Sequence, residues 1–475
     1  MTRQPADRPA APSAAPSAAP SAALSADRRE LMTRLLARKA AAAAVPVLPR
    51  AGEPMECSHE QRRVWLAGQV TPEAAPPNVT LGLAVTGELD LPRLAAALSA
   101  LVSRHEALRT RYAAPDGLPH QVVRPAQPVP LELVDLTCLP EPAREPEALA
   151  LALTAAGERF DLARGPLLRL TVYRLGPLEH RLFLVCHHIA CDGAGVALVA
   201  DDLAALYGGA DLPPVVPQYA DYAAWSVRRA AERLPGRLPY WRDRLAGLEP
   251  LFPRLPATAA IGATGGRAAA TASVRVERDL VDRLRAAPAG GGGGAPVTAF
   301  AALLAAYLVL LRRLTGRSDL VVGTVTSGRA RRELEPVVGC FINLVPLRVD
   351  LGGLTGFPAL LARVRETVAG ALANEIPFDA LVSGLGGHRL PGVHPSFQAA
   401  FVHREDPAPP RGWPGLDVRV WEHEVDDGGF DLGLTATPRG TRYELALTGR
   451  LARFAPAELG ALAARLAAVV ADPSL

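Results

Sequence analysis

An apolar strand, a tight turn and a helix follow one another without a break, and this unit constrains the fold most strongly. The segment HRLFLVCHHI (180–189) has the apolar run of a buried β-strand. The segment GVALVADDLAALYGG (195–209) predicts a helix that ends at two glycines. The strand ends at two adjacent histidines, His187 and His188, and the turn that follows carries Asp192. Such a unit is typical of an α/β fold.

The same alternation of strands and helices recurs along the chain. A helix with Leu94, Leu98 and Leu101 on one face is predicted before a short strand that begins near residue 108. In that strand Arg109 should point away from the face of its apolar neighbours. Further strands are predicted at NVTLGLAV, PLLRLTVYRL, TASVRVERDL and DLVVGTVTSGR, and a long apolar helix at VTAFAALLAAYLVLLRRLTG. We find no residue-level repeat.

Composition excludes several classes of protein. With 475 residues, 49% of them hydrophobic, the chain can build two packed domains. The net charge is only +3, and its arginines are scattered among acids, so no nucleic-acid surface is expected. No apolar stretch reaches the ~20 residues that span a bilayer, and no secretory signal is seen. Five cysteines without paired spacing favour a reducing cytoplasm over a disulfide framework.

The ends and loops suggest how the chain is divided. Residues 1–25 form a Pro/Ala/Ser tract that is expected to be disordered, and residues 26–50 predict a helix that serves as a linker or docks on a partner. An N-terminal half over 51–225 and a C-terminal half over 226–475 should follow. The glycines at 290–294 are interpreted as a flexible loop, because no Lys-Ser/Thr follows to make a phosphate cradle.

The turn with the two histidines invites a chemical interpretation. Neighbouring strand residues point in opposite directions, so only one of His187 and His188 can face a cavity. That geometry disfavours a metal site built from Cys186, His188 and Cys191, and no metal is expected. A histidine beside a helix N-terminus can take a proton from a nucleophile while free N–H groups face a developing oxyanion. The alternative is a histidine pair that only packs at the end of a strand.

The stretch His-His-x-x-x-Asp-Gly is one of several motifs that occur in order along the chain. The others are SHEQRRVW (58–65), RHEALRT (104–110), YADYAAW (219–225), VGCFINLVPLR (338–348) and NEIPFD (374–379), with VGTVTSGR, FDLGLTA and the tail of HPSFQAAF beside them. On these motifs the sequence resembles the condensation domains of nonribosomal peptide synthetases. The resemblance covers nearly all of the chain after the N-terminal tail.

The resemblance implies a fold and a set of roles. The family fold has two chloramphenicol-acetyltransferase-like lobes that form a V-shaped pseudo-dimer with a central tunnel. His188 would be the catalytic histidine, which serves the attacking amine as base or positioning acceptor. His187 and Asp192 would be structural, and Arg109 is expected to form a salt bridge with Asp192. The tunnel for the phosphopantetheine arm would include Gly193, Ser327 and Asn343.

Partners and products follow from the same resemblance. The chain would bind no cofactor of its own, because carrier proteins deliver its substrates on 4′-phosphopantetheine arms. A donor carrier protein, and in some cases an acceptor carrier protein, are the expected partners of a monomer in the cytoplasm that takes part in antibiotic and other secondary-metabolite biosynthesis. The expected reaction joins an acyl or aminoacyl thioester to an amine, or to an alcohol. No adenylation or carrier motif is present, which leaves open a free-standing enzyme or an excised first domain.

Departures from the family pattern keep alternatives open. Ala194 and Gly195 follow the Asp-Gly pair where members often have Trp-Ser, and HPSFQAAF lacks the usual Arg-Asp-x-Ser run. The glutamate motif of epimerization domains is not found, and heterocyclization domains replace the histidines. The remaining alternatives are a stand-alone acyltransferase with a soluble acceptor and a non-catalytic module that recruits carrier proteins or a tailoring enzyme.

Overall fold

The computed structural model describes residues 44–50, 52–70, 77–252, 269–286, 297–386, 397–405, 412–423 and 429–473. The tract 1–25, most of the expected helix 26–50 and the glycines 290–294 lie outside the described residues, and residues 44–50 are not helical. The chain divides into two compact units, residues 1–45 and 46–475, and everything below concerns the second.

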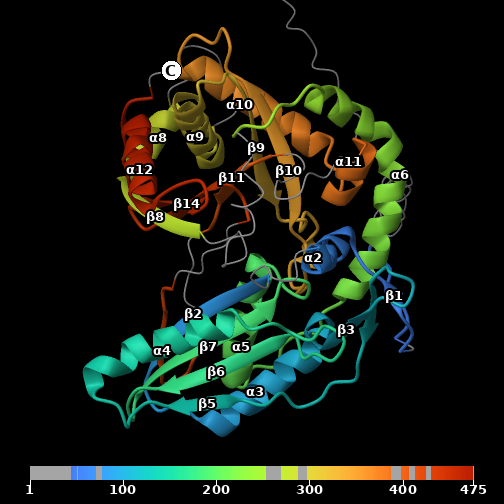
Figure 1. Ribbon diagram of the computed structural model, residues 1–475. Coiled ribbons are helices and arrows are strands. Elements are labelled where there is room, and N and C mark those ends of the chain that lie inside the picture. Colours follow the sequence, from blue (N-terminus) through green and yellow to red (C-terminus); the bar gives the residue numbers. More distant parts are fainter. Residues whose placement is uncertain are drawn as a thin grey trace, which may run out of the picture. The chain divides into compact units, whose positions relative to one another are not determined.

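The first lobe is built on a sheet with the strand order β12-β2-β7-β6-β5 (Figure 1). Neighbouring strands are antiparallel except for the parallel pair β5 and β6. Helix α3 packs against α5, while α5 and α4 contact β2. The bounds are β2 Asn78–Thr86, α3 Leu91–Arg104, β5 Glu132–Asp135, α4 Glu141–Ala156, β6 Leu168–Arg174, β7 Glu179–His187, α5 Gly193–Tyr207 and β12 Asp417–Val420.

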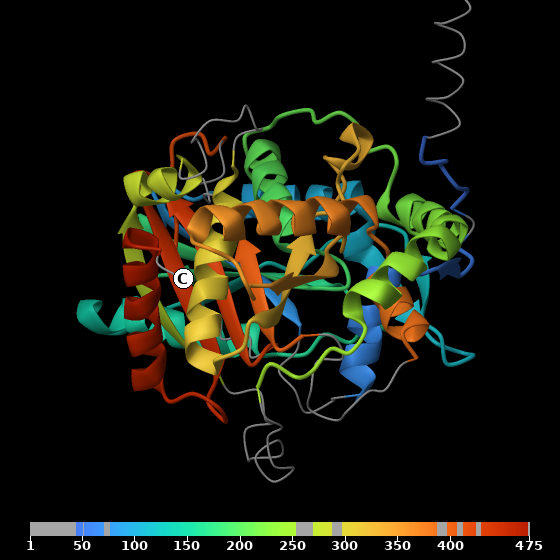
Figure 2. The same ribbon diagram turned by 90° about the horizontal axis from the view of Figure 1, so that it is seen from above.

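The second lobe has a larger sheet with the order β10-β9-β11-β13-β14-β8. The helices α9, α10 and α12 lie together against it (Figure 2). The bounds are β8 Ala269–Glu277, α8 Arg278–Ala286, α9 Ala299–Thr315, β9 Asp319–Thr326, β10 Asn343–Asp350, α10 Phe357–Ala373, β11 Ala399–His403, β13 Leu432–Arg439, β14 Arg442–Arg450 and α12 Pro456–Ala471.

Smaller elements complete the described chain. Three short strands pair in the order β1-β4-β3, and helix α2 follows β1 directly. The bounds are β1 Met55–Glu56, α2 His59–Val70, β3 Thr110–Ala113, β4 His120–Val123, α6 Tyr219–Leu245 and α11 Phe378–Gly384, with 3-10 turns at Glu106–Arg109 and Arg332–Leu334.

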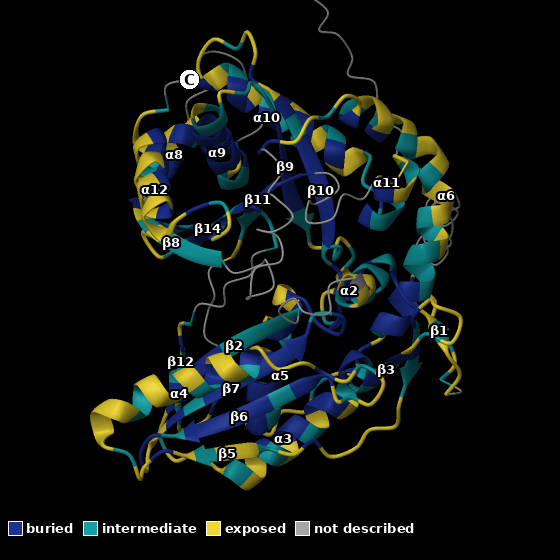
Figure 3. Cartoon of the chain, viewed as in Figure 1, coloured by how far each residue is buried: buried dark blue, intermediate teal, exposed yellow. Residues whose placement is uncertain are grey.

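Each sheet has its own hydrophobic core. The core of the second lobe surrounds α9, in which every residue from Ala301 to Leu311 is buried (Figure 3). Its apolar sequence is therefore explained by burial on all sides and not by a membrane. Thr298 caps the start of α9, and Gly316, at φ 72°, ends it in the left-handed conformation.

The predicted elements agree with the structure, with one shift. Leu94, Leu98 and Leu101 are fully buried on α3, and Asp90 caps that helix by accepting the N–H of Arg93. The strands expected over PLLRLTVYRL and HRLFLVCHHI are the antiparallel neighbours β6 and β7. The short strand begins at Thr110 and not at residue 108, because residues 106–109 form a 3-10 turn.

Two segments connect the lobes, and neither follows the boundary that the sequence predicts after residue 225. Helix α6 runs across that position, and Trp241 near its end belongs to the core of the second lobe. Strand β12 comes from the C-terminal half, yet it pairs with β2 of the first lobe. Gly82 on β2 permits this pairing, because a Cβ there would lie 2.6 Å from the carbonyl oxygen of Trp421.

The close packing of α6 on the second lobe can be tested at Gly339. A Cβ at this position would lie 1.8 Å from Cδ2 of Tyr219, whose side chain is 1% exposed. We expect Gly339→Ala to lower the free energy of unfolding by about 1–3 kcal/mol, as overpacking does. Urea unfolding measures it. The control Gly236→Ala, in α6 where a Cβ meets nothing, should be neutral or stabilising, and equal effects would contradict the prediction.

Candidate active site

Strand β7 carries the histidine pair to the end of the first sheet. Its pairing with β2 ends at His187, which lies opposite Asn78. The N–H of His188 donates to the carbonyl oxygen of Pro77 at 2.8 Å, and the N–H of Ala190 donates to that of His187 at 2.9 Å. The chain therefore turns immediately after the two histidines, and α5 begins three residues after Ala190.

His187 holds the turn. Its side chain is buried, with its ring edge on to Phe160, and its Nδ1 accepts the N–H of Ile189 at 3.1 Å. Burial lowers its pKa to about 4, with smaller contributions from His188 and Arg159. His187 is thus neutral at pH 7, and because Nδ1 is an acceptor, the ring proton is on Nε2.

His188 has different surroundings. It is half-buried, and its Nδ1 lies 3.6 Å from Sγ of Cys340, which belongs to the second lobe. The two adjacent rings thus contact different parts of the molecule, as their alternation at the end of a strand predicts. His187 contacts groups of the first lobe, whereas His188 lies where the two lobes meet.

Asp192 makes four hydrogen bonds, three of them to the second lobe, which together we call the Asp192 clamp. Its Oδ1 accepts the N–H of Gly195 at 2.7 Å, which caps α5. Its Oδ2 accepts the N–H of Phe341 at 2.9 Å and Nη1 of Arg329 at 2.7 Å. Its own N–H donates to the carbonyl oxygen of Gly339 at 3.1 Å. The carboxylate is fully buried, and the second lobe supplies most of its partners.

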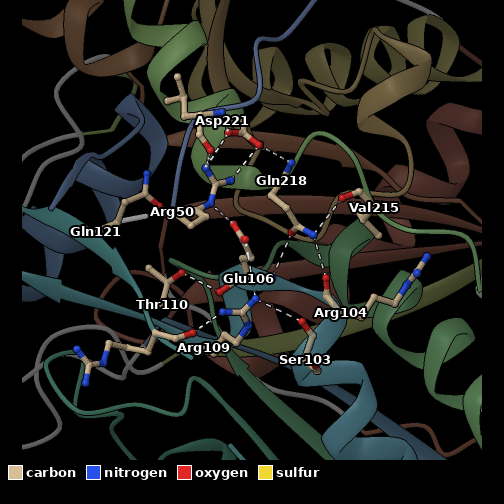
Figure 4. A network of polar contacts seen from close by, with 12 residues as sticks. Arg50, Ser103, Arg104, Glu106, Arg109, Thr110, Gln121, Val215, Gln218 and Asp221 are labelled. Atoms are coloured by element: carbon tan, nitrogen blue, oxygen red, sulfur yellow. Dashed lines mark hydrogen bonds and ion pairs between the residues drawn. The ribbon is translucent and has the colours of Figure 1, made fainter. Parts of the chain in front are cut away.

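The prediction of a salt bridge between Arg109 and Asp192 is wrong, because Arg329 forms the salt bridge with Asp192. Arg109 donates instead to the carbonyl oxygens of Arg124 and Ser103, and its Nη2 lies 3.9 Å from Oε1 of Glu106 (Figure 4). Its position at the end of a 3-10 turn directs the guanidinium toward these groups.

The contacts around Arg109 belong to a scaffold that fixes the start of α6. Nη1 and Nη2 of Arg50 donate to the two carboxylate oxygens of Asp221, each at 2.9 Å. Its Nε lies 2.7 Å from Oε2 of Glu106 (Figure 4). Gln218 also bridges this region, because its Nε2 donates to the carbonyl oxygen of Arg104 at 2.9 Å. The motifs RHEALRT and YADYAAW therefore contribute structural contacts here.

Helix α6 in turn holds the segment that contains Cys340. The hydroxyl of Tyr219 donates to the carbonyl oxygen of Cys340 at 2.5 Å and lies 2.8 Å from Oγ of Ser58. The ring of Phe341 packs edge-on to Tyr219, and the guanidinium of Arg329 lies 4.2 Å from its centroid. The loop facing His188 is thus fixed from two sides.

The two glycines after Asp192 differ in their surroundings. Gly193 is exposed, and a Cβ there would meet no atom within 4 Å. A Cβ at Gly195 would lie 2.9 Å from Sγ of Cys191 and 3.2 Å from Oδ1 of Asp192. The glycine at 195 therefore fits the tight packing around the Asp192 clamp.

Asn343 and Ser327 are both predicted to line the tunnel, and the structure places them in different surroundings. The Asn343 amide donates to Oε1 of Glu375 at 3.0 Å and to the carbonyl oxygen of Ile376 at 2.9 Å, and its Oδ1 accepts the N–H of Phe378. These bonds fix the turn before α11. Ser327 is exposed directly after β9. A tunnel-lining role stays a prediction for both.

Arg329, Cys340 and Tyr219 are site residues that the sequence reasoning missed. Each lies inside a stretch that was recognised as a motif, so the signal was present. Their partners are more than 100 positions away in the sequence, with Arg329 and Asp192 separated by 137. No local pattern indicates such a contact.

Features outside the histidine turn do not add to the site. Among the described ranges, no three His, Cys, Asp or Glu side chains are placed to hold a metal ion. Within the same ranges, no helix combines the length and apolarity needed to cross a membrane. A depression of about 550 Å³ is lined by Asp135, Arg144, Arg174 and His180 among others. It lies at the opposite end of β7 from His188 and is not part of the candidate site.

Comparison with known proteins decides the family. The family model described as "Condensation domain" matches residues 53–472, including the His motif and the second-lobe partners of Asp192. The chain belongs to the condensation-domain family. Its mixed α/β fold with two lobes is the one expected from the sequence.

Individual relatives agree with this assignment. The chain is 35% identical over 473 residues to phosphinothricin tripeptide synthetase PhsC of Streptomyces viridochromogenes. The matched region covers 94% of this chain but only 42% of that protein. The X-domain from teicoplanin biosynthesis, also solved in complex with OxyB, is 29% identical over 91% of this chain and 98% of that one, with a TM-score of 0.79. The first condensation domain of the calcium-dependent antibiotic synthetase, at 23% identity, matches in fold over 89% and 98%, with a TM-score of 0.71.

The Asp192 clamp predicts the effect of removing its cation. Arg329→Met would leave the carboxylate of this condensation domain buried and without its charged partner, so we expect a loss of about 3–5 kcal/mol in the free energy of unfolding. Arg419→Met is the control, because Arg419 and Asp417 form an exposed pair that should contribute less than about 1 kcal/mol. Urea unfolding compares the two, and a loss at Arg329 as small as the control would contradict the clamp.

Because His187 is neutral in the folded protein, the free energy of unfolding should depend on pH. Its native pKa of about 4 lies below its ordinary value of 6.5, so the unfolded chain binds more protons between these pH values. The stability contributed by neutral His187 is therefore present above pH ~6.5 and is lost as the pH falls toward ~4, by about 3 kcal/mol.

The substitution His187→Asn tests this dependence, because its amide oxygen can still accept the N–H of Ile189 but does not titrate. Urea unfolding between pH 4 and 7 should show a shallower pH slope for His187→Asn than for the wild type. Identical slopes in the two proteins would show that His187 does not titrate as inferred.

Proposed function

We propose that this condensation domain transfers an acyl or aminoacyl group from the phosphopantetheine thioester of a carrier protein to an amine, and so forms an amide bond in nonribosomal peptide biosynthesis. The observation that carries the proposal is the placement of His188, half-buried at the end of β7 and next to the first turn of α5. The Asp192 clamp fixes that turn against the second lobe. The proposed partners are a donor carrier protein and, where the acceptor is also tethered, a second carrier protein.

In the proposed reaction the nitrogen of the amine attacks the thioester carbonyl, the C–N bond forms and the C–S bond breaks. His188 accepts the hydrogen that the amine loses, and the leaving sulfur of the arm receives a proton. The exposed residues Gly193 and Ala194 open α5, where helix N–H groups favour a developing negative charge. A positioned base contributes about 10²–10⁴ in rate, so the alignment of two substrates must supply much of the rest.

A second candidate function is a module that recruits a partner without catalysis. The observation that favours it is the similarity to the teicoplanin X-domain, which was solved in complex with OxyB. The complete His-His-x-x-x-Asp-Gly motif favours catalysis. Transfer to a soluble alcohol or amine is a third outcome, since the acceptor is not determined by the residues described above.

Intact mass spectrometry of acyl transfer tests the proposal. Carrier proteins loaded with a panel of acyl and aminoacyl groups would be mixed with tethered or soluble amines and alcohols. We expect transfer to an amine that falls about 10²–10⁴-fold in His188→Ala, because the base is lost. The half-exposed His120→Ala, distant in sequence from the motif, should be active.

The same assay separates the alternatives. Transfer only to an alcohol would overturn the amide product and establish ester formation, and transfer to a soluble amine would show that no second carrier protein is needed. Carrier-protein binding without transfer, equal in wild type and His188→Ala, would contradict catalysis and support the recruiting module.

A further inference from the structure

Helix α6 carries four side chains that follow one another at intervals of four residues. They are Trp225, Arg229, Arg233 and Arg237, and the helix is continuous over all of them. Side chains four positions apart lie above one another on an α-helix, so the four share one face, which we call the α6 basic face. At a rise of about 1.5 Å per residue, the pattern repeats every ~6 Å over a length of ~18 Å.

The α6 basic face is open to solvent. Arg233 is exposed, while Trp225, Arg229 and Arg237 are half-buried. Figure 3 shows the change along α6 from a buried first turn to intermediate and exposed residues farther on. A partner can therefore reach Arg233 without any movement of the helix.

Acidic side chains do not balance the charge of this face. Within the part of the chain that the structure describes, Arg229, Arg233 and Arg237 form no ion pair, and Arg237 donates to the backbone carbonyl oxygen of Glu375. Desolvation and then the repulsion of Arg229 and Arg237 lower the pKa of Arg233, and Glu232 counteracts them. The three positive charges repel one another, so an anionic partner would relieve that repulsion.

An aromatic ring lies at the start of the α6 basic face. The guanidinium of Arg229 lies 5.1 Å from the ring centroid of Trp225, and that of Arg331, in the loop after β9, lies 5.5 Å from it. Arg331 follows Arg329 by two residues, so the face adjoins the loop that supplies the cation of the Asp192 clamp. Tryptophan and arginine are enriched among the residues that dominate binding at protein interfaces. The composition of the face is therefore typical of a protein-binding surface.

We propose that the α6 basic face is a docking surface for a protein partner that presents an acidic helix with carboxylates at every fourth residue. Such carboxylates repeat at the same ~6 Å interval, so each can approach one of the three guanidinium groups when the two helices lie side by side. An apolar side chain one turn beyond the carboxylates would contact Trp225. Docking of this kind needs neither His188 nor a thioester, so the inference does not depend on the proposed acyl transfer.

A nucleic acid is the competing occupant, and the charge of the whole chain disfavours it. The net charge is only +3, with 51 basic residues against 48 acidic ones, so no strong long-range field attracts a polyanion. The positive charge is instead concentrated along one face of one helix. That distribution favours a partner with a matching line of acids.

Binding of a designed peptide to the full chain tests the docking surface. The probe is an alanine-rich helical peptide with glutamate at every fourth position and a fluorescent label, and fluorescence anisotropy at low ionic strength measures its Kd. We expect Arg233→Glu to weaken binding about 10-fold, because the central contact then joins like charges. The matched control is Arg465→Glu, which reverses an exposed arginine on α12 and should change Kd by less than about 2-fold.

The fold of the variant is checked separately. Arg233 makes no hydrogen bond or ion pair with the described residues, so the thermal unfolding midpoint of Arg233→Glu should match that of the wild type. Equal effects of Arg233→Glu and Arg465→Glu on Kd would overturn the inference, because net charge alone would then explain the binding.

Charge reversal on both sides provides a sharper readout. A peptide whose central glutamate is replaced by lysine should bind the wild type weakly and regain affinity for Arg233→Glu, because opposite charges meet again. Failure of this rescue would contradict the proposed register. Equal binding of a peptide with the same composition, but without the four-residue spacing, would contradict it as well.

A DNA duplex serves as the probe for the competing occupant. Tighter binding of the duplex than of the peptide, lost in Arg233→Glu, would overturn the protein partner in favour of a nucleic acid. Weak binding of the duplex that the variant does not change would support the inference. Because none of these measurements uses acyl transfer, the inference can fail while the proposed function holds, and the reverse.

Discussion

A buried carboxylate is the constraint on which this molecule depends. Asp192 has no exposure to water, so its charge must be compensated by protein groups or the folded state would be strongly disfavoured. One N–H from its own helix, one from Phe341 and the guanidinium of Arg329 meet that requirement. Because two of these donors come from the second lobe, the first lobe alone cannot compensate the charge of Asp192.

This dependence gives the His-His-x-x-x-Asp-Gly motif a physical explanation. The spacing puts the histidines at the end of a strand and the acid at the cap of the next helix, so a turn of three residues separates the candidate base from the clamp. The clamp then determines where the loop 339–341 lies, and that loop places Cys340 against His188. The surroundings of the candidate base are therefore complete only when both lobes have folded together.

The local parts of this arrangement could be predicted from the sequence, whereas its long-range parts could not. The strand, turn and helix around His188 follow from apolar periodicity, and Leu94, Leu98 and Leu101 pointed correctly to the core face of α3. The partner of Asp192 did not follow, because Arg109 and Arg329 both lie in motif stretches and only the fold shows that a 3-10 turn directs Arg109 elsewhere. Strand β12 likewise joins a sheet whose other strands lie more than 200 residues earlier.

The two histidines are adjacent, yet their protonation need not interfere. A positive charge on His187 would lie next to His188 and would disfavour proton uptake there. Burial against Phe160 and the acceptor role of its Nδ1 keep His187 neutral, with a pKa of about 4. In the proposed reaction, His188 would then accept a proton without a positive charge on the adjacent residue. A buried, turn-forming histidine thus assists the proposed base by remaining uncharged, which a lysine or arginine at the same position would not do.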